Sequence, residues 1–243
     1  MPTLLLVEDN QHIQRIYREK FRREGFAVTM ATNGREGLLA ARQGRPDAIL
    51  LDIMMPEVNG FELLHQLRAE PDLSATPVFM LSNKAWPDDI QHSLSLGARR
   101  FYSKGSASLQ EIVTQIRHDC GLKKLILISP NAKAAEPVVA VLQHPRLLCC
   151  VVSVMAEMSA AERSAPDLIV LDTTPPAPNA SPLLGQLKST PATRAVPVLA
   201  ITDHPDKFAR ADHHVSPAHL TTALRPAVLN QLALTDPVAV AAT

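Results

Sequence analysis

Five side chains suited to phosphoryl transfer stand directly after short apolar segments of the chain. They are the acidic pair Glu8-Asp9, then Asp52, Ser82 and Lys104. Three carboxylates gathered in a small space repel one another, so they require a counter-charge. Mg²⁺ prefers carboxylate oxygen and would meet that need. A carboxylate such as Asp52 can then act as a nucleophile towards phosphorus, while a hydroxyl and an ammonium bind the phosphoryl oxygens.

The segments before these residues have the pattern of parallel strands, because several are almost continuously apolar. Amphipathic stretches alternate with them, and Asn10 is a candidate cap for the first helix. This alternation predicts an α/β fold with a doubly wound parallel sheet, in which ligands bind beyond the carboxyl ends of the strands. The predicted strands are Thr3–Val7, Phe26–Ala31, Ala48–Leu51, Val78–Leu81 and Arg100–Ser103; the predicted helices follow Asn10 and cover 34–42, 61–69, 87–96 and 108–119.

The chain contains two copies of one pattern. Residues 46–52 read PDAILLD and residues 166–172 read PDLIVLD, an offset of 120 positions. Further matches follow at this offset without a gap, and they place Thr202 opposite Ser82. A period of this length matches a whole domain rather than a solenoid repeat. We therefore predict two domains of one fold, residues 1–121 and 122–234, followed by a flexible tail of residues 235–243.

Composition excludes several classes of protein. Lys plus Arg number 24 and Asp plus Glu number 24, and no basic segment typical of a nucleic-acid binder stands out. The three cysteines lack the spacing of a metal site. No apolar run approaches the length of a membrane helix, and the first residues do not resemble a secretion signal. We expect a cytoplasmic protein that binds neither nucleic acid nor membrane.

The combined pattern resembles the receiver domain of two-component response regulators, over residues 3–119. The residues that carry this resemblance are the pair Glu8-Asp9, Asp52 with Pro56 and Gly60 downstream, Ser82, Phe101 and Lys104. It implies a flavodoxin-like sheet of five parallel strands with the order 2-1-3-4-5 in each copy. Because the chain ends after the second copy, we expect no DNA-binding or enzymatic output domain, and signalling through protein–protein contact or onward phosphotransfer.

The resemblance also implies roles for the individual residues. Asp52 would accept the phosphoryl group, and Asp9 and Asp52 would hold Mg²⁺ with the Met54 backbone carbonyl, while Glu8 acts mainly through water. Ser82 and Lys104 would bind the phosphoryl group, and Ser82 with Phe101 would form the switch pair. Departures from the family pattern are Met54, two residues after Asp52, Asn83 after Ser82, and Gly105 after Lys104.

The second copy has lost most of these residues. Ser129-Pro130 replaces the acidic pair, and the best sequence alignment puts Ser216 at the position of Lys104. The degenerate second site keeps Asp172 and Thr202. We interpret this copy as a pseudo-receiver suited to docking or dimerisation, with an eroded fourth helix.

The expected partners are a histidine kinase or phosphotransfer protein, which would phosphorylate Asp52, and an unidentified downstream protein; a homodimer is compatible with this interpretation. One alternative is a phosphatase with an aspartyl nucleophile, but the haloacid-dehalogenase type needs a second aspartate at position 54, where Met54 stands. Another alternative is an inert scaffold. A flavin site is disfavoured because Glu8 and Asp9 would repel a phosphate.

Overall fold

The structure is a computed structural model that describes residues 1–153, 166–175 and 180–234. The chain divides into two compact units, residues 2–122 and residues 123–243. The predicted tail of residues 235–243 lies outside the described residues. Within the described residues, none of the helices combines the length and apolar character needed to cross a membrane.

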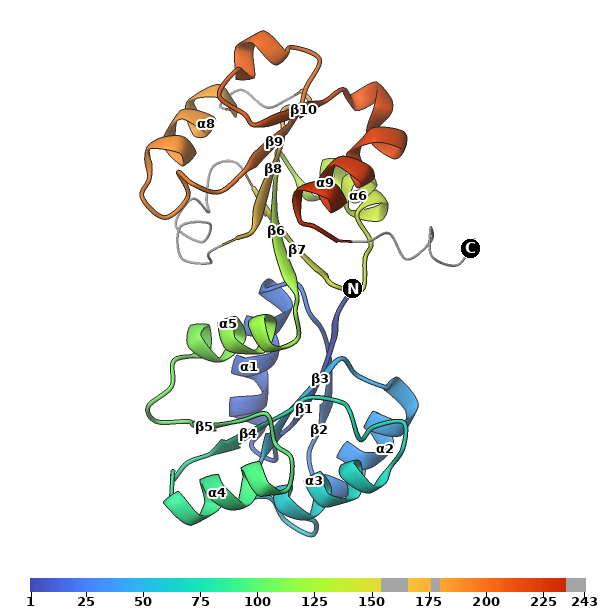
Figure 1. The fold of residues 1–243 in the computed structure, drawn as a ribbon, viewed down its shortest axis with the longest axis vertical. Coiled ribbons are helices and arrows are strands. Elements are labelled where there is room, and N and C mark those ends of the chain that lie inside the picture. The colour runs from blue at the N-terminus through green and yellow to red at the C-terminus, as the bar shows by residue number, and fades with distance from the viewer. Residues whose placement is uncertain (154–165, 176–179, 235–243) are drawn as a thin grey trace. The chain divides into compact units, whose positions relative to one another are not determined.

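The first unit is a five-stranded parallel sheet with helices on both faces (Figure 1). Its strand order is β2-β1-β3-β4-β5, as the resemblance implied. The predicted strands and helices are all present, with ends that differ by a few residues at most. In chain order they are β1 (Thr3–Val7), α1 (Gln11–Arg23), β2 (Ala27–Ala31), α2 (Gly34–Gly44), β3 (Ala48–Asp52), α3 (Gly60–Ala69), β4 (Val78–Ser82), α4 (Pro87–Ser95), β5 (Arg100–Ser103) and α5 (Leu109–Asp119).

Both faces of the strands β1, β3 and β4 are buried, which explains their continuous apolar runs. On one face, Leu63, Leu64 and Leu67 of α3 pack with Ala41 of α2 against alternate residues of the central strands. On the other face lie α1 and α5, which contact each other (Figure 1). Every residue of β3 and β4 is buried. The two central strands are therefore rigid supports for whatever stands at their carboxyl ends.

The second unit repeats this topology, with the strand order β7-β6-β8-β9-β10. The prediction of two flavodoxin-like parallel sheets is confirmed. Helices α6 and α9 contribute buried residues to one face and α8 to the other. The elements are β6 (Lys123–Ser129), α6 (Ala132–Val141), β7 (Leu147–Ser153), β8 (Leu168–Asp172), α8 (Ala180–Ser189), β9 (Val198–Ile201), β10 (His213–Val215) and α9 (Arg225–Gln231).

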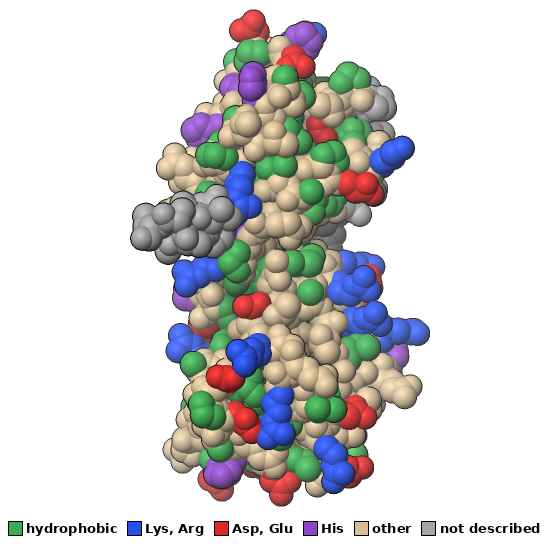
Figure 2. All heavy atoms as spheres, turned by 90° about the vertical axis from the view of Figure 1, so that its right-hand side faces the viewer, with side chains coloured by type: hydrophobic (Ala, Val, Ile, Leu, Met, Phe, Trp, Pro, Cys, Tyr) green, Lys and Arg blue, Asp and Glu red, His purple; other side chains and the backbone are tan. Residues whose placement is uncertain are grey.

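The predicted loss of the fourth helix in the second copy is confirmed. Residues 202–212 are all described, and a 3-10 turn at Pro205–Phe208 takes the place that α4 has in the first unit. Figure 2 shows one face of the molecule, on which acidic and basic side chains are interspersed. This agrees with the balanced charge of the whole chain.

Candidate functional site

The four predicted strand-end positions meet at one edge of the first sheet. Strand register pairs Val7 with Leu51, and Asp52 with Leu81. Glu8 follows β1 directly and Lys104 follows β5 directly. Because all five strands are parallel, their carboxyl ends lie on the same side. The fold therefore brings these side chains together for the reason that the sequence suggested.

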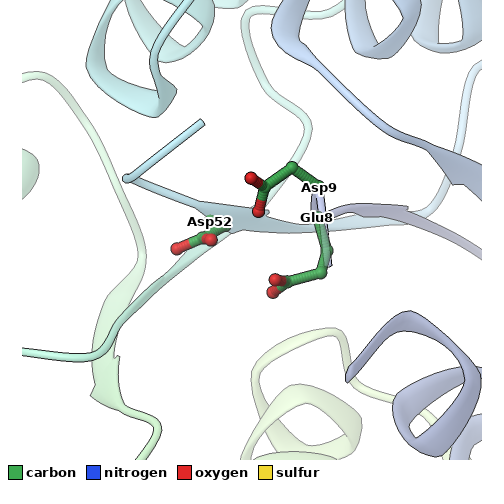
Figure 3. Close-up of side chains that lie close together, drawn as sticks. All are labelled: Glu8, Asp9 and Asp52. Carbon is green, nitrogen blue, oxygen red and sulfur yellow. The ribbon is translucent and has the colours of Figure 1, made fainter. Parts of the chain in front are cut away.

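Three carboxylates form a cluster at this edge. Oxygen atoms of Glu8, Asp9 and Asp52 all lie within 4.8 Å of one another, and Figure 3 shows the three carboxylates converging on a common space. Glu8 and Asp52 are buried, whereas Asp9 is exposed. Buried oxygens from two strands with one exposed oxygen beside them fit a hard cation such as Mg²⁺, which keeps several water ligands. The predicted carboxylate ligands are thus close enough to share one ion.

Lys104 lies against the two buried carboxylates. Its Nζ is 2.7 Å from Glu8 Oε2 and 2.8 Å from Asp52 Oδ2, and its side chain is only 8% exposed. Burial raises the pKa of Glu8 and of Asp52, although hydrogen bonds from Lys104 act in the opposite direction. Burial alone would lower the pKa of Lys104, but its bonds to Asp52 and Glu8 outweigh burial and raise it. The ammonium therefore supplies the counter-charge that holds two buried carboxylates side by side.

Ser82 ends β4 and Phe101 lies on β5, the two strands that follow β3 in the sheet. Ser82 is buried and directly follows Leu81, the residue of β4 that pairs with Asp52. Its hydroxyl accepts a hydrogen bond of 3.2 Å from the Lys84 N–H. Phe101 is half-buried and packs against the apolar core shared with α2 and α3. Their roles as a phosphoryl ligand and a switch pair stay predictions.

The loop after Asp52 is shaped by close backbone contacts. The Met54 N–H lies 3.4 Å from Asp52 Oδ1, while the Met54 side chain is 68% exposed. A Cβ atom at Gly60 would lie 2.3 Å from the Asp52 carbonyl oxygen, so only glycine fits there. The next helix begins in a capping box formed by Asn59 and Glu62. These features hold the turn that follows Asp52 in place.

One buried polar residue near the cluster escaped the sequence analysis. Gln14 of α1 donates hydrogen bonds of 2.8 Å to the carbonyl oxygens of Glu8 and Ala31. The signal was present in the sequence, because Gln14, Tyr17 and Phe21 share the helical spacing of a buried face. A glutamine on such a face requires partners for its amide group.

Comparisons with known proteins agree with this geometry. Residues 4–117 match the family model described as the response regulator receiver domain. The protein PilH of Pseudomonas aeruginosa is 34% identical over 104 residues, which span 43% of this chain and 86% of PilH. The chain belongs to the response regulator receiver family. Its receiver is the first unit.

Another relative and a solved structure also match about half of the chain. An uncharacterised transcriptional regulatory protein of Bacillus subtilis, YkoG, is 36% identical over 114 residues, which span 47% of this chain and 49% of YkoG. The chain thus spans about half the length of the transcriptional regulatory proteins that it matches. The chemotaxis protein CheY4 of Vibrio cholerae has 27% identity and a TM-score of 0.46, over 49% of this chain and 98% of CheY4.

In the second unit, the counterpart of Asp52 is held by neutral groups. Asp172 is buried, and its Oδ2 accepts a hydrogen bond of 2.9 Å from the Ser129 hydroxyl. Its Oδ1 accepts bonds from the Thr174 N–H at 3.0 Å and the Thr174 hydroxyl at 2.6 Å. The Thr202 hydroxyl accepts a hydrogen bond of 3.0 Å from the His204 N–H. Hydroxyl and amide donors thus occupy both carboxylate oxygens of Asp172. Its counterpart in the receiver, Asp52, faces Lys104 instead.

The sequence alignment of the last strand was wrong by one residue. Register pairs Val215 with Ile201, just as Tyr102 pairs with Leu81 in the receiver. Counted from these pairs, Ser216 corresponds to Ser103, and Pro217 rather than Ser216 stands at the position of Lys104. The error arose because the connection before β10 is shortened, so the sequence alone does not set the strand's register. Ser216 instead donates a hydrogen bond of 2.6 Å to Asp203.

Proposed function

We propose that the receiver accepts a phosphoryl group on Asp52 from a histidine kinase or phosphotransfer protein, and signals by protein–protein contact. The observation that carries this proposal is the gathering of Glu8, Asp9, Asp52 and Lys104 at one edge of the sheet. Receiver domains interact with such donors, which act in the cytoplasm, so we infer the same location for this chain. Assisting its own phosphorylation and dephosphorylation is the full extent of the chemistry that we propose.

The chemistry at Asp52 is a displacement at phosphorus. One carboxylate oxygen of Asp52 attacks the phosphorus atom of a phosphohistidine while the phosphorus–nitrogen bond breaks and the imidazole leaves. Lys104 can move its ammonium from Asp52 to a phosphoryl oxygen at little cost, because Glu8 remains 2.7 Å away as a second partner. The negative charge that arrives with the phosphoryl group is thereby matched by a cation already in the site.

Mg²⁺ is the cofactor that the donor set fits. We propose that Asp9 and Asp52 hold it with the Met54 carbonyl, and that Glu8 contributes mainly through water. When bound, the ion would neutralise the oxygens of the incoming phosphoryl group. The exposed position of Asp9 beside two buried carboxylates leaves room for the water ligands that Mg²⁺ retains.

The proposed switch begins at Ser82. Its hydroxyl would turn from the Lys84 N–H towards a phosphoryl oxygen, which frees the start of the β4–α4 loop. The Phe101 ring, half-buried against the core, would then move inward. Phosphorylation biases two existing conformations in this way, and the surface of α4, β5 and α5 differs between them.

We propose that the second unit is a pseudo-receiver that is not phosphorylated and acts in docking, including docking to a second copy of the chain. Asp172 already has its oxygens bonded to Ser129 and Thr174. Neither side chain carries the positive charge that a phosphoryl group would require. Pro217, which stands at the position equivalent to Lys104, supplies no positive charge either.

Phosphorylation by acetyl phosphate in the presence of Mg²⁺ tests both statements. Intact-mass spectrometry should find one phosphoryl group per chain in the wild type and in Asp172→Ala, and none in Asp52→Ala. Asp172→Ala is the matched control, since it removes the equivalent carboxylate of the other copy. An unmodified wild type would leave the inert scaffold as the better interpretation. A phosphoryl group that persists in Asp52→Ala would refute the assignment of the acceptor.

A further inference from the structure

Gln14 holds two backbone carbonyl groups at the edge of the sheet where the carboxylates gather. Its side chain is buried, and its Nε2 donates to Glu8 O and Ala31 O, each at 2.8 Å. The first carbonyl belongs to a residue of the carboxylate cluster, and the second belongs to the last residue of β2. A single amide group therefore ties α1 to the ends of two neighbouring strands.

These bonds complete the anchoring of the Glu8 backbone. The Glu8 N–H donates to Ala31 O at 3.1 Å, while its carbonyl receives the Gln14 amide. Both main-chain groups of Glu8 are thus bonded at the point where the chain leaves β1. Asp9 follows directly, so the direction of its carboxylate depends on the same anchor. Orientation of ligand side chains by such supporting bonds commonly alters metal affinity by about 10- to 100-fold.

The second unit shows that the fold itself does not require this amide. Leu5 pairs with Ile49, and Ile126 pairs with the matching Ile169. Counted from these pairs, Glu8 corresponds to Ser129 and Gln14 to Ala135.

The helix start is otherwise preserved between the two units. Asn10 and Asn131 both cap their helices with the side-chain oxygen. Ala135 is buried in an apolar core, where it provides no side-chain donor. The copy that has Ser129-Pro130 in place of the acidic pair therefore forms the same strand, cap and helix with alanine at this position.

We propose that Gln14 is a positioning residue for the metal site, which orients Glu8 and Asp9 by anchoring the Glu8 carbonyl. This inference rests on the proposed Mg²⁺ site of the receiver. It assigns the buried amide to the carboxylate cluster rather than to the packing of α1.

The test compares Gln14→Met and Gln14→Ala with the control Gln11→Met in the full chain. Methionine keeps the length of the side chain but lacks the amide donor, and alanine copies the second unit. Gln11 is exposed on the same helix, so its replacement controls for the loss of an amide from α1. Two quantities are measured: hydrogen exchange of the Glu8 amide in metal-free protein by NMR, and the Kd of Mg²⁺ by isothermal titration calorimetry.

We expect both Gln14 variants to keep the far-ultraviolet circular dichroism of the wild type, to exchange the Glu8 amide about tenfold faster, and to bind Mg²⁺ about tenfold more weakly. Gln11→Met should match the wild type. Unchanged exchange and a Kd within about twofold of the wild type would overturn the inference. Failure of both variants to fold would also overturn it, because the amide would then serve the fold. A wild type that does not bind Mg²⁺ would instead refute the proposed function, and the exchange rates would still report on the anchor.

Discussion

Replacing Lys104 by methionine tests whether its ammonium is the counter-charge of the buried carboxylates. The side chains of Lys104, Glu8 and Asp52 are 8%, 1% and 2% exposed, so solvent screens their interaction little. Methionine fills similar space without the charge. Two buried carboxylates would then face each other and Asp9 with no cation between them.

The expected loss of stability follows from the burial of these groups. Removing one partner of a buried ion pair costs about 3–5 kcal/mol, because the remaining charge stays desolvated. Lys104 is shared by two carboxylates, so the two pairs are not independent and the cost is not doubled. With a urea slope of about 2 kcal/mol per M, the unfolding midpoint should fall by about 2 M in EDTA at pH 8.

The loss of stability in Lys104→Met should depend on pH, and the pKa shifts of the two buried carboxylates give the direction of this dependence. Burial already raises the pKa of Glu8 and of Asp52, and Lys104 acts to lower both. Without Lys104 both values rise further above those of the unfolded chain. A raised pKa in the folded state means that stability is retained at low pH and lost as the pH rises through the folded value. The difference in free energy of unfolding between the wild type and Lys104→Met should therefore be smaller at pH 5 and larger at pH 8.

Trp86 makes the measurement specific to the receiver. It is the only tryptophan of the chain, so its fluorescence during urea denaturation reports the first unit. Lys84→Met removes the same charge from the exposed β4–α4 loop and should change stability by less than about 0.5 kcal/mol. Mg²⁺ should raise the free energy of unfolding of Lys104→Met by more than it raises that of the wild type, because the ion replaces the missing positive charge. A loss below about 1 kcal/mol for Lys104→Met at pH 8 would refute the reasoning.

Two further predictions concern stability away from the cluster. Glu57 has φ of 64°, a left-handed conformation that costs an L-residue about 1 kcal/mol or more. Glu57→Gly should therefore raise the free energy of unfolding, followed by Trp86 fluorescence in urea, by about 0.5 kcal/mol after the greater flexibility of glycine in the unfolded chain is subtracted. A lower free energy of unfolding would contradict this. A hydrogen bond from Arg100 lowers the pKa of Asp119, and Asp119→Asn should cost about 1 kcal/mol at pH 7, discounted for the partly exposed Arg100. Because the folded pKa is depressed, the stability that Asp119 contributes is present above about pH 4 and is lost as the pH falls through the folded value, so the difference in free energy of unfolding between the two proteins should shrink steadily as the pH is lowered below about 4.

Much of the fold could be predicted because local and tertiary preferences agree in it. Strands buried on both faces need continuous apolar runs, and β3 and β4 have them. The edge strand β2 is largely exposed, yet it was still found from the alternation of strands and helices. The carboxylate cluster followed from the same alternation, since parallel strands end on one side of the sheet.

What the sequence did not reveal depends on pairings between distant residues. The position of Pro217 is set by the ladder of hydrogen bonds to β9, and the shortened connection before β10 leaves two alignments one residue apart. The bonds of Gln14 to Glu8 and Ala31 join three elements, so no local pattern contains them. The ion pair of Lys104 with Glu8 was also unforeseen, since the analysis considered the lysine only as a ligand of the phosphoryl group.

The two copies differ in how a buried aspartate at the end of the third strand is neutralised, and this difference carries the functional argument. Asp172 is bonded to hydroxyl and amide donors of Ser129 and Thr174, which are neutral and fixed in place. Asp52 faces a lysine that it shares with Glu8. The Lys104 ammonium can be redirected to a new anion, whereas hydroxyl and amide donors satisfy the carboxylate without supplying the positive charge that a phosphoryl group requires. The phosphoryl transfer that we propose at Asp52, and its proposed absence at Asp172, therefore follow from one physical requirement that is met in two ways.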